Sequence, residues 1–186
     1  SIDLLKRARD EGSPDFDRIL GRTIDTVSRQ VANLKEIASD FHALTGSSAA
    51  RPEVFDARTI VEEVLELNAA WAEERGVATA CEGPGGLLRV DPGLLRRVLV
   101  NLVSNALEAM PDGGRLRFDL RPGAGRTLVI ELTDTGTGVP EEVRARLFEP
   151  YFTTRSTGTG LGLAIARRVV EEMGGTITLD AADPPP

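Results

Sequence analysis

The chain has 186 residues, of which 41% are hydrophobic and 27% charged, enough for one domain or two small ones around a buried core. Its formal net charge of −7 argues against nucleic acid or an anionic membrane as the main partner, since both attract a basic surface. The only cysteine is Cys81 and the only histidine is His42, which excludes an internal disulfide and a Cys/His metal cluster. No apolar stretch reaches the ~20 residues of a membrane span and no signal peptide opens the chain, so we expect a cytoplasmic protein.

The first 48 residues have the pattern of a helical hairpin. "SIDLLKRARDEG" starts without a cap and predicts the end of a helix, which breaks at residues 12–14. From residue 20 to residue 41, apolar or small side chains alternate in steps of four and three, typical of a coiled coil or four-helix bundle. These positions are Leu20, Ile24, Val27, Val31, Leu34, Ala38 and Phe41. A helix buries such a stripe only against another helix, so residues 1–48 predict a hairpin that lacks the start of its first helix.

Residues 45–54 are small and polar and predict a linker. Beyond it, helical and strand-like segments alternate, so we expect a separate domain over residues 49–186. Its first elements are a helix over residues 56–71 and short strands over residues 77–81 and 87–90.

The stretch "NLVSNALEAM" places Asn101 and Asn105 four residues apart in a helix that Asp91 and Pro92 open as N-cap and first turn. At 100° per residue, both amides lie at the edge of the apolar face of this helix. Asparagine is a mediocre helix former, so its presence needs a reason. Taken alone, the pattern fits either an incidental polar face or a polar ledge that lines a pocket.

After this helix, residues 116–120 and 128–133 predict two paired strands joined by "RPGAGR". "DTGTG" follows at Asp134 to Gly138. A carboxylate at a strand end, followed by glycines, admits a flat molecule close to the backbone, or it forms an ordinary capped turn.

The last third predicts a helix opening at Pro140, a second helix ending at Gly174, and a final strand, "TITLDA". The second helix follows "GTGLGL", residues 158–163, whose N–H groups and helix dipole suit a phosphate. The loop has no Lys-Ser/Thr of a P-loop, and its glycine spacing is not the dinucleotide pattern.

In chain order, the segments "NLVSNALEAM", "DTGTG", "FEPYFTT" and "GTGLGL" resemble the N, G1, F and G2 boxes of sensor histidine kinases. The N-terminal segment looks most like the hairpin of nitrogen-regulation sensor kinases. The resemblance implies an α+β fold, in which a helical hairpin precedes a Bergerat-type α/β sandwich with a mixed sheet and helices on one face. The superfamily also includes gyrase, mismatch-repair ATPases and heat-shock chaperones.

The resemblance also implies a site for ATP or ADP with Mg²⁺. Asp134 would bind the adenine amino group, with Gly136 and Gly138 making room for the base. Asn105 would bind Mg²⁺ beside the phosphates, and Asn101 would assist. The lid would be residues 148–156, and residues 158–162 would wrap the phosphates. The residues of these two segments that the resemblance places in the ATP site are Phe148, Thr154, Arg155, Gly158, Thr159, Gly160, Leu161 and Gly162.

The implied activity is Mg-ATP-dependent phosphorylation of a histidine, followed by transfer to an aspartate of a response-regulator receiver domain. Relatives that hydrolyse ATP resemble one another in carrying glutamate at the position of Asn101, since water needs a general base. His42 lacks the acidic residue that follows the acceptor histidine in the family, so we expect the acceptor outside this chain. The hairpin implies a homodimer, and a membrane sensor can precede it in this subgroup.

Two alternatives remain open on the residues. Glu108 stands where many family members carry a lysine, and with the missing acceptor it leaves room for a nucleotide-binding scaffold without phosphotransfer. An ATPase of the same superfamily is disfavoured by Asn101.

Overall fold

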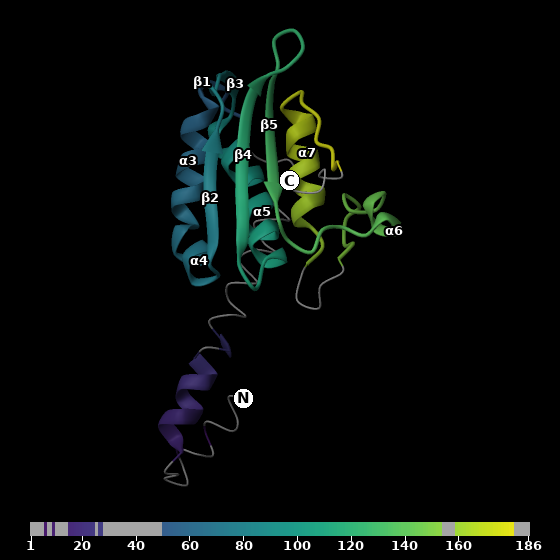
Figure 1. Cartoon of the computed structure of the whole chain (residues 1–186). Coiled ribbons are helices and arrows are strands. Elements are labelled where there is room, and N and C mark those ends of the chain that lie inside the picture. The colour runs from purple at the N-terminus through teal and green to yellow at the C-terminus, as the bar shows by residue number, and fades with distance from the viewer. Residues whose placement is uncertain are drawn as a thin grey trace. The chain divides into compact units, whose positions relative to one another are not determined.

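A computed structural model of the chain (Figure 1) describes residues 6, 9, 15–24, 26–27, 50–153 and 159–180. The chain divides into two compact units, Ser1–Gly46 and Ser47–Pro186. In the first unit, residues 16–24 are helical, and the hydroxyl of Thr23 donates to the carbonyl of Ile19 at 2.8 Å. Most of the predicted hairpin, including His42, lies outside the described residues, so the hairpin stays a prediction. No helix among the described residues is long and apolar enough to cross a membrane.

The second unit is a mixed α/β domain, as predicted. Strand β2 runs parallel to the central strand β4, whereas β5 pairs with β4 in the antiparallel direction, and β1 pairs separately with β3. The order β2-β4-β5 therefore makes a mixed sheet. The elements are β1 (Glu53–Asp56), α3 (Ala57–Leu67), α4 (Ala69–Glu74), β2 (Val77–Glu82), β3 (Leu87–Val90), α5 (Pro92–Ala109), β4 (Gly114–Pro122), β5 (Leu128–Asp134), α6 (Glu141–Arg144) and α7 (Gly162–Glu172).

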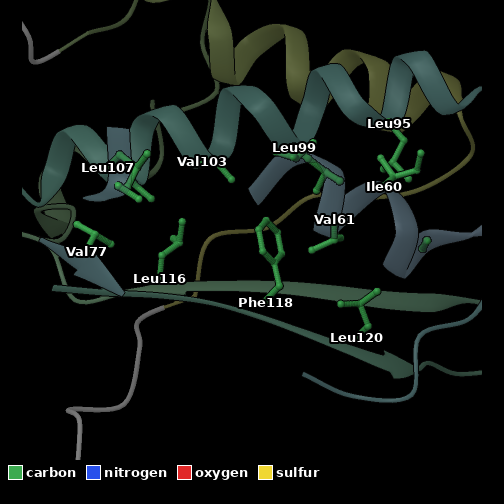
Figure 2. Close-up of a cluster of buried hydrophobic side chains, with 14 of the residues drawn as sticks. Ile60, Val61, Val77, Leu95, Leu99, Val103, Leu107, Leu116, Phe118 and Leu120 are labelled. Carbon is green, nitrogen blue, oxygen red and sulfur yellow. The ribbon is translucent and has the colours of Figure 1, made fainter. Parts of the chain in front are cut away.

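The core lies between the sheet and the long helix α5. Every second residue of β4 is buried on one face, and α5 presents a buried residue every three or four positions toward it (Figure 2). Helix α3 closes the core beside them. The side chains that meet there include Leu116, Phe118 and Leu120 of β4, Leu95, Leu99, Val103 and Leu107 of α5, and Ile60 and Val61 of α3. This packing fixes α5 on the sheet and sets the rotation of its polar edge.

Helix α5 begins at the predicted cap. The Asp91 carboxylate accepts hydrogen bonds from the backbone N–H groups of Gly93 at 2.8 Å and Leu94 at 3.1 Å, with Pro92 in the first turn. Its other oxygen accepts from the backbone N–H of Arg51 at 2.8 Å. The bond from Arg51, followed by those from the helix, lowers the pKa of Asp91 below its ordinary value.

Four expectations about secondary structure were wrong in detail. Residues 53–56 form β1, which overlaps the end of the predicted linker and the start of the predicted helix. The helix predicted over residues 56–71 breaks at Asn68, whose side chain donates to the carbonyl of Val64 at 2.8 Å. Helix α6 extends over four residues only. Residues 176–180 are irregular where the alternating "TITLDA" predicted a strand.

Candidate functional site

The polar edge of α5 lies against the start of α7. Both Asn101 and Asn105 are half-buried, and the side-chain amide of Asn101 donates to the carbonyl of Gly162, the first residue of α7, at 3.1 Å. Because the nitrogen of this amide makes the bond, its oxygen is left as the acceptor of the group. From the sequence we expected the helix that carries the two asparagines and the end of the glycine loop to form one site. The direct contact between Asn101 and Gly162 is consistent with that expectation.

The turn after β5 packs on the C-terminal end of the same helix, α5. The Asp134 carboxylate accepts from the backbone N–H of Gly136 at 2.9 Å, and the N–H of Thr137 donates to the carbonyl of Ala109 at 3.2 Å. A Cβ at Gly136 would lie 2.8 Å from both the Cβ and the carbonyl oxygen of Ala109. Only glycine permits this approach, so the turn is fixed on the last residue of α5.

Sequence reasoning missed a second support of this turn. The Thr135 hydroxyl accepts from the backbone N–H of Arg115 at 3.0 Å and contacts the sulfur of Met110 at 3.7 Å. The N–H of Thr135 donates in turn to the carbonyl of Arg115 at 3.2 Å. These contacts tie the Asp134 turn to the start of β4, and a threonine directly after a strand-terminal aspartate was the available signal.

The described end of the glycine loop packs on the segment before it. Gly160 has φ +68°, and a Cβ there would lie 2.6 Å from the carbonyl carbon of Tyr151 and 2.9 Å from the N of Phe152. The hydroxyl of Thr159 accepts from the N–H of Leu161 at 3.3 Å. This backbone approach joins the F and G2 segments directly.

Aromatic contacts anchor the segment that precedes residue 154. The centre of the half-buried ring of Phe148 lies 5.8 Å from the guanidinium carbon of Arg167 on α7. The centre of the Phe152 ring lies 4.5 Å from the guanidinium carbon of Arg146. Tyr151 is 74% exposed with φ 64°, an unusual conformation for a side chain of this size.

The remaining predicted site residues fall into two groups. Gly138 has φ +69° with open space around its Cα, in keeping with a loose turn, and Glu108 is exposed on α5. Thr154, Arg155 and Gly158 lie outside the described residues. Within the described ranges, no group of three or more His, Cys, Asp or Glu side chains forms a metal cluster.

A protein-family model described as "Histidine kinase-, DNA gyrase B-, and HSP90-like ATPase" matches residues 90–185, which contain all four motifs. The nitrogen regulation protein NtrY of Azorhizobium caulinodans is 35% identical over 190 residues, which cover 98% of this chain and 24% of NtrY. The sensor protein FixL of Bradyrhizobium diazoefficiens is 34% identical and covers 92% of this chain and 34% of FixL. The chain thus spans a quarter to a third of the length of these relatives.

Among solved structures, full-length ShkA in complex with AMPPNP superimposes with a TM-score of 0.71 at 28% identity, covering 82% of this chain and 34% of ShkA. The chain therefore belongs to the histidine kinase-, DNA gyrase B- and HSP90-like ATPase family, and within it to the sensor histidine kinases.

Proposed function

We propose that this chain is the catalytic part of a sensor histidine kinase, which binds Mg-ATP and transfers its γ-phosphoryl group to a histidine. The observation that carries the proposal is the hydrogen bond from Asn101 to Gly162, made by the same helix on which the Asp134 turn packs. Helix α5 would then contact both the turn that carries the adenine-binding carboxylate and the end of the phosphate-binding loop. The family match and the names of the relatives support this proposal.

At the adenine end, Asp134 would accept a hydrogen bond from the exocyclic amino group. One carboxylate oxygen accepts from the N–H of Gly136, and none of the described residues donates to the other oxygen. A charged acceptor makes a stronger bond than a neutral one, which favours adenine over a base with a carbonyl at that position. Gly136 has no side chain, so the base can approach the backbone of the turn.

At the phosphate end, the first turn of α7 offers backbone N–H groups and the positive end of the helix dipole. Oxygen donors suit Mg²⁺, and the amide oxygens of Asn101 and Asn105 fit that requirement. When bound, Mg²⁺ neutralises phosphate charge and helps to orient the γ-phosphoryl group. The bond from Asn101 to Gly162 would keep the glycine loop beside these oxygens, and Arg155 would add a permanent cation from the lid.

Similarity to sensor histidine kinases also supports a proposal for the phosphoacceptor and for the partner protein. The phosphoacceptor would be a histidine outside this chain, and the phosphoryl group would pass on to an aspartate of a response-regulator receiver domain. The protein would form a homodimer through its N-terminal hairpin and act in the cytoplasm. Asn101 supports a kinase over an ATPase. Attack by water requires a general base, which an amide cannot provide, whereas a neutral histidine imidazole can attack the phosphoryl group near pH 7 without one.

Two measurements test the proposal. Isothermal titration of the whole chain with ATP should show uptake that depends on Mg²⁺. Incubation with labelled ATP and a separate fragment carrying the family's acceptor helix should then yield phosphohistidine, identified by its acid lability and base stability. Binding of Mg-ATP without any phosphohistidine would overturn the kinase assignment, and turnover to ADP and phosphate without acceptor would point to an ATPase.

A further inference from the structure

A second concave surface lies at the end of the sheet away from Asp134. Along the β4–β5 ladder, Asp134 pairs with Leu116, whereas Pro122 and Leu128 form the last pair, six residues and ~20 Å farther on. Figure 1 shows β1, β3 and the β4–β5 loop at that end. An open pocket of about 380 Å³ occurs there, and we call it the hairpin pocket. It is lined by Gly85, Gly86, Leu87, Leu88, Arg89, Pro122, Arg126, Thr127 and Leu128.

Bonds from the last residue of β1 and from the first turn of α3 hold one wall of the hairpin pocket in place. Asp56 accepts from the N–H of Gly86 at 3.2 Å, and the guanidinium of Arg58 donates to the carbonyls of Gly83 at 2.6 Å and Cys81 at 3.1 Å. A Cβ at Gly86 would lie 2.9 Å from a methyl group of Leu128, so the two walls meet closely there. These bonds fix the segment from Gly83 to Gly86 on one side of the pocket.

Two arginines, Arg89 and Arg126, give the pocket positive charge. Several exposed arginines elsewhere pair with carboxylates, as Arg117 does with Glu82 and Arg121 with Glu131. Arg89 and Arg126 are both exposed, and neither has an ion pair with any residue that the structure describes. In a chain of net charge −7, two such arginines on one pocket attract an anionic partner.

Apolar side chains adjoin the two arginines. In the β1–β3 register, Val54 lies opposite Arg89, and Leu87 is two residues from Arg89, so all three share one face of this sheet. Val54 is 65% exposed and Leu87 is 73% exposed, although large apolar side chains are usually covered. The surface is thus both apolar and cationic.

We propose that the hairpin pocket and the adjoining face of β1–β3 bind an acidic segment of a partner protein, in which carboxylates flank an apolar side chain. The carboxylates would pair with Arg89 and Arg126, and the apolar side chain would cover Leu87 and enter the pocket. Guanidinium groups bind carboxylates through two parallel hydrogen bonds, which gives such a contact direction as well as attraction. The pocket lies at the opposite end of the β4–β5 ladder from Asp134, so it can be occupied while a base is bound at that carboxylate.

The test is selection of a displayed random decapeptide library on the immobilised whole chain. Peptides that also bind the Arg89→Glu/Arg126→Glu variant are removed. We expect the surviving sequences to carry Asp or Glu beside Leu, Ile or an aromatic residue. In fluorescence anisotropy, the best peptide should bind at least about tenfold more weakly to either single variant. The variant Arg168→Glu, with the same charge change on the exposed face of α7, should bind it like the unaltered chain.

Mg-ATP titration of each variant shows that the fold is retained and keeps this proposal separate from the nucleotide site. Survivors without acidic residues, no survivors at all, or equal binding by the arginine variants would each overturn the proposal. A concentration-dependent dimer in analytical ultracentrifugation that Arg126→Glu abolishes would also overturn it, because a second copy would then be the occupant.

Discussion

The side-chain amide of Asn101 donates a hydrogen bond to the main-chain carbonyl of Gly162, 61 residues later in the chain. The bond joins the middle of α5, which the core fixes against the sheet, to the first residue of α7. It therefore holds the end of the glycine loop at the polar edge of α5. The two predicted phosphate-site segments meet through this contact.

We predict that Asn101→Ala lowers both stability and nucleotide affinity. Loss of one neutral hydrogen bond should reduce the free energy of unfolding by about 1 kcal/mol. Affinity for Mg-ATP should fall at least about tenfold, since the phosphate loop loses its anchor and the cation loses an oxygen ligand. Urea unfolding and isothermal titration measure the two effects.

Asn68→Ala is the matched control, because Asn68 donates the same kind of bond to the carbonyl of Val64 at the end of α3. It should lose similar stability and keep full nucleotide affinity. If both alanine variants weakened Mg-ATP binding equally, the effect of Asn101 would be general destabilisation and not a role in the site.

Asp134→Asn should separate base recognition from folding. An asparagine oxygen can still accept from the N–H of Gly136, so the melting temperature should change little. A hydrogen bond to a charged group contributes about 1.5–3 kcal/mol, so affinity for ATP should fall at least about tenfold. The preference for ATP over GTP should narrow, as competition titration would measure. Asp119→Asn, on β4, should alter neither, and unchanged ATP affinity of Asp134→Asn would refute adenine binding by this carboxylate.

Local signals in the sequence were sufficient for much of the fold. The cap of Asp91 and Pro92 and the 3.6-residue pattern predicted α5, and strict alternation predicted β4 and β5. The errors occurred where a distant partner decides the structure. Residues 53–56 become a strand because β3 pairs with them, whereas residues 176–180 alternate in polarity but pair with no strand in the described part of the chain.

The candidate site was predictable in its motifs but not in its contacts. Asn101, Asp134 and the glycines were identified through the order of the motifs, which resembles a known family. That Asn101 would bond Gly162, or that Gly136 would pack on Ala109, depends on how α5 and α7 pack together. No sequence pattern indicated that Arg89 and Arg126 line one pocket. The pocket forms between residues 85–89 and the loop that joins β4 to β5, and such a surface has no periodic signature in the sequence.

Gly160→Ala should abolish nucleotide binding by displacing the loop. Any alanine with φ near +68° costs roughly 1–2 kcal/mol. A Cβ at Gly160 would in addition lie 2.6 Å from the backbone of Tyr151, which has to move. Gly125, with φ +66° and no atom within 4 Å of a Cβ, provides the same backbone penalty without the clash. Gly125→Ala should therefore lose stability only, and Mg-ATP affinity of Gly160→Ala equal to that of Gly125→Ala would contradict a tight loop.

The Asp91 cap should make part of the stability depend on pH. Backbone hydrogen bonds, first that from Arg51, hold the pKa of Asp91 below its ordinary value of 3.8. A carboxyl whose pKa is lower in the folded state stabilises the fold fully above its unfolded pKa, and this contribution is lost as the pH falls through the folded pKa. At pH 7, Asp91→Ala should reduce the free energy of unfolding by about 1 kcal/mol.

Asp91→Asn distinguishes the charge from the cap, because asparagine also caps helices but does not titrate in this range. We expect the wild-type chain to be more stable than Asp91→Asn at pH 7. The difference should begin to shrink below about pH 4 and vanish as the wild-type carboxyl is protonated. Urea unfolding at intervals from pH 7 to the lowest pH at which the chain stays folded measures it. A difference that grows toward low pH would show that the charged carboxylate of Asp91 does not stabilise the start of α5.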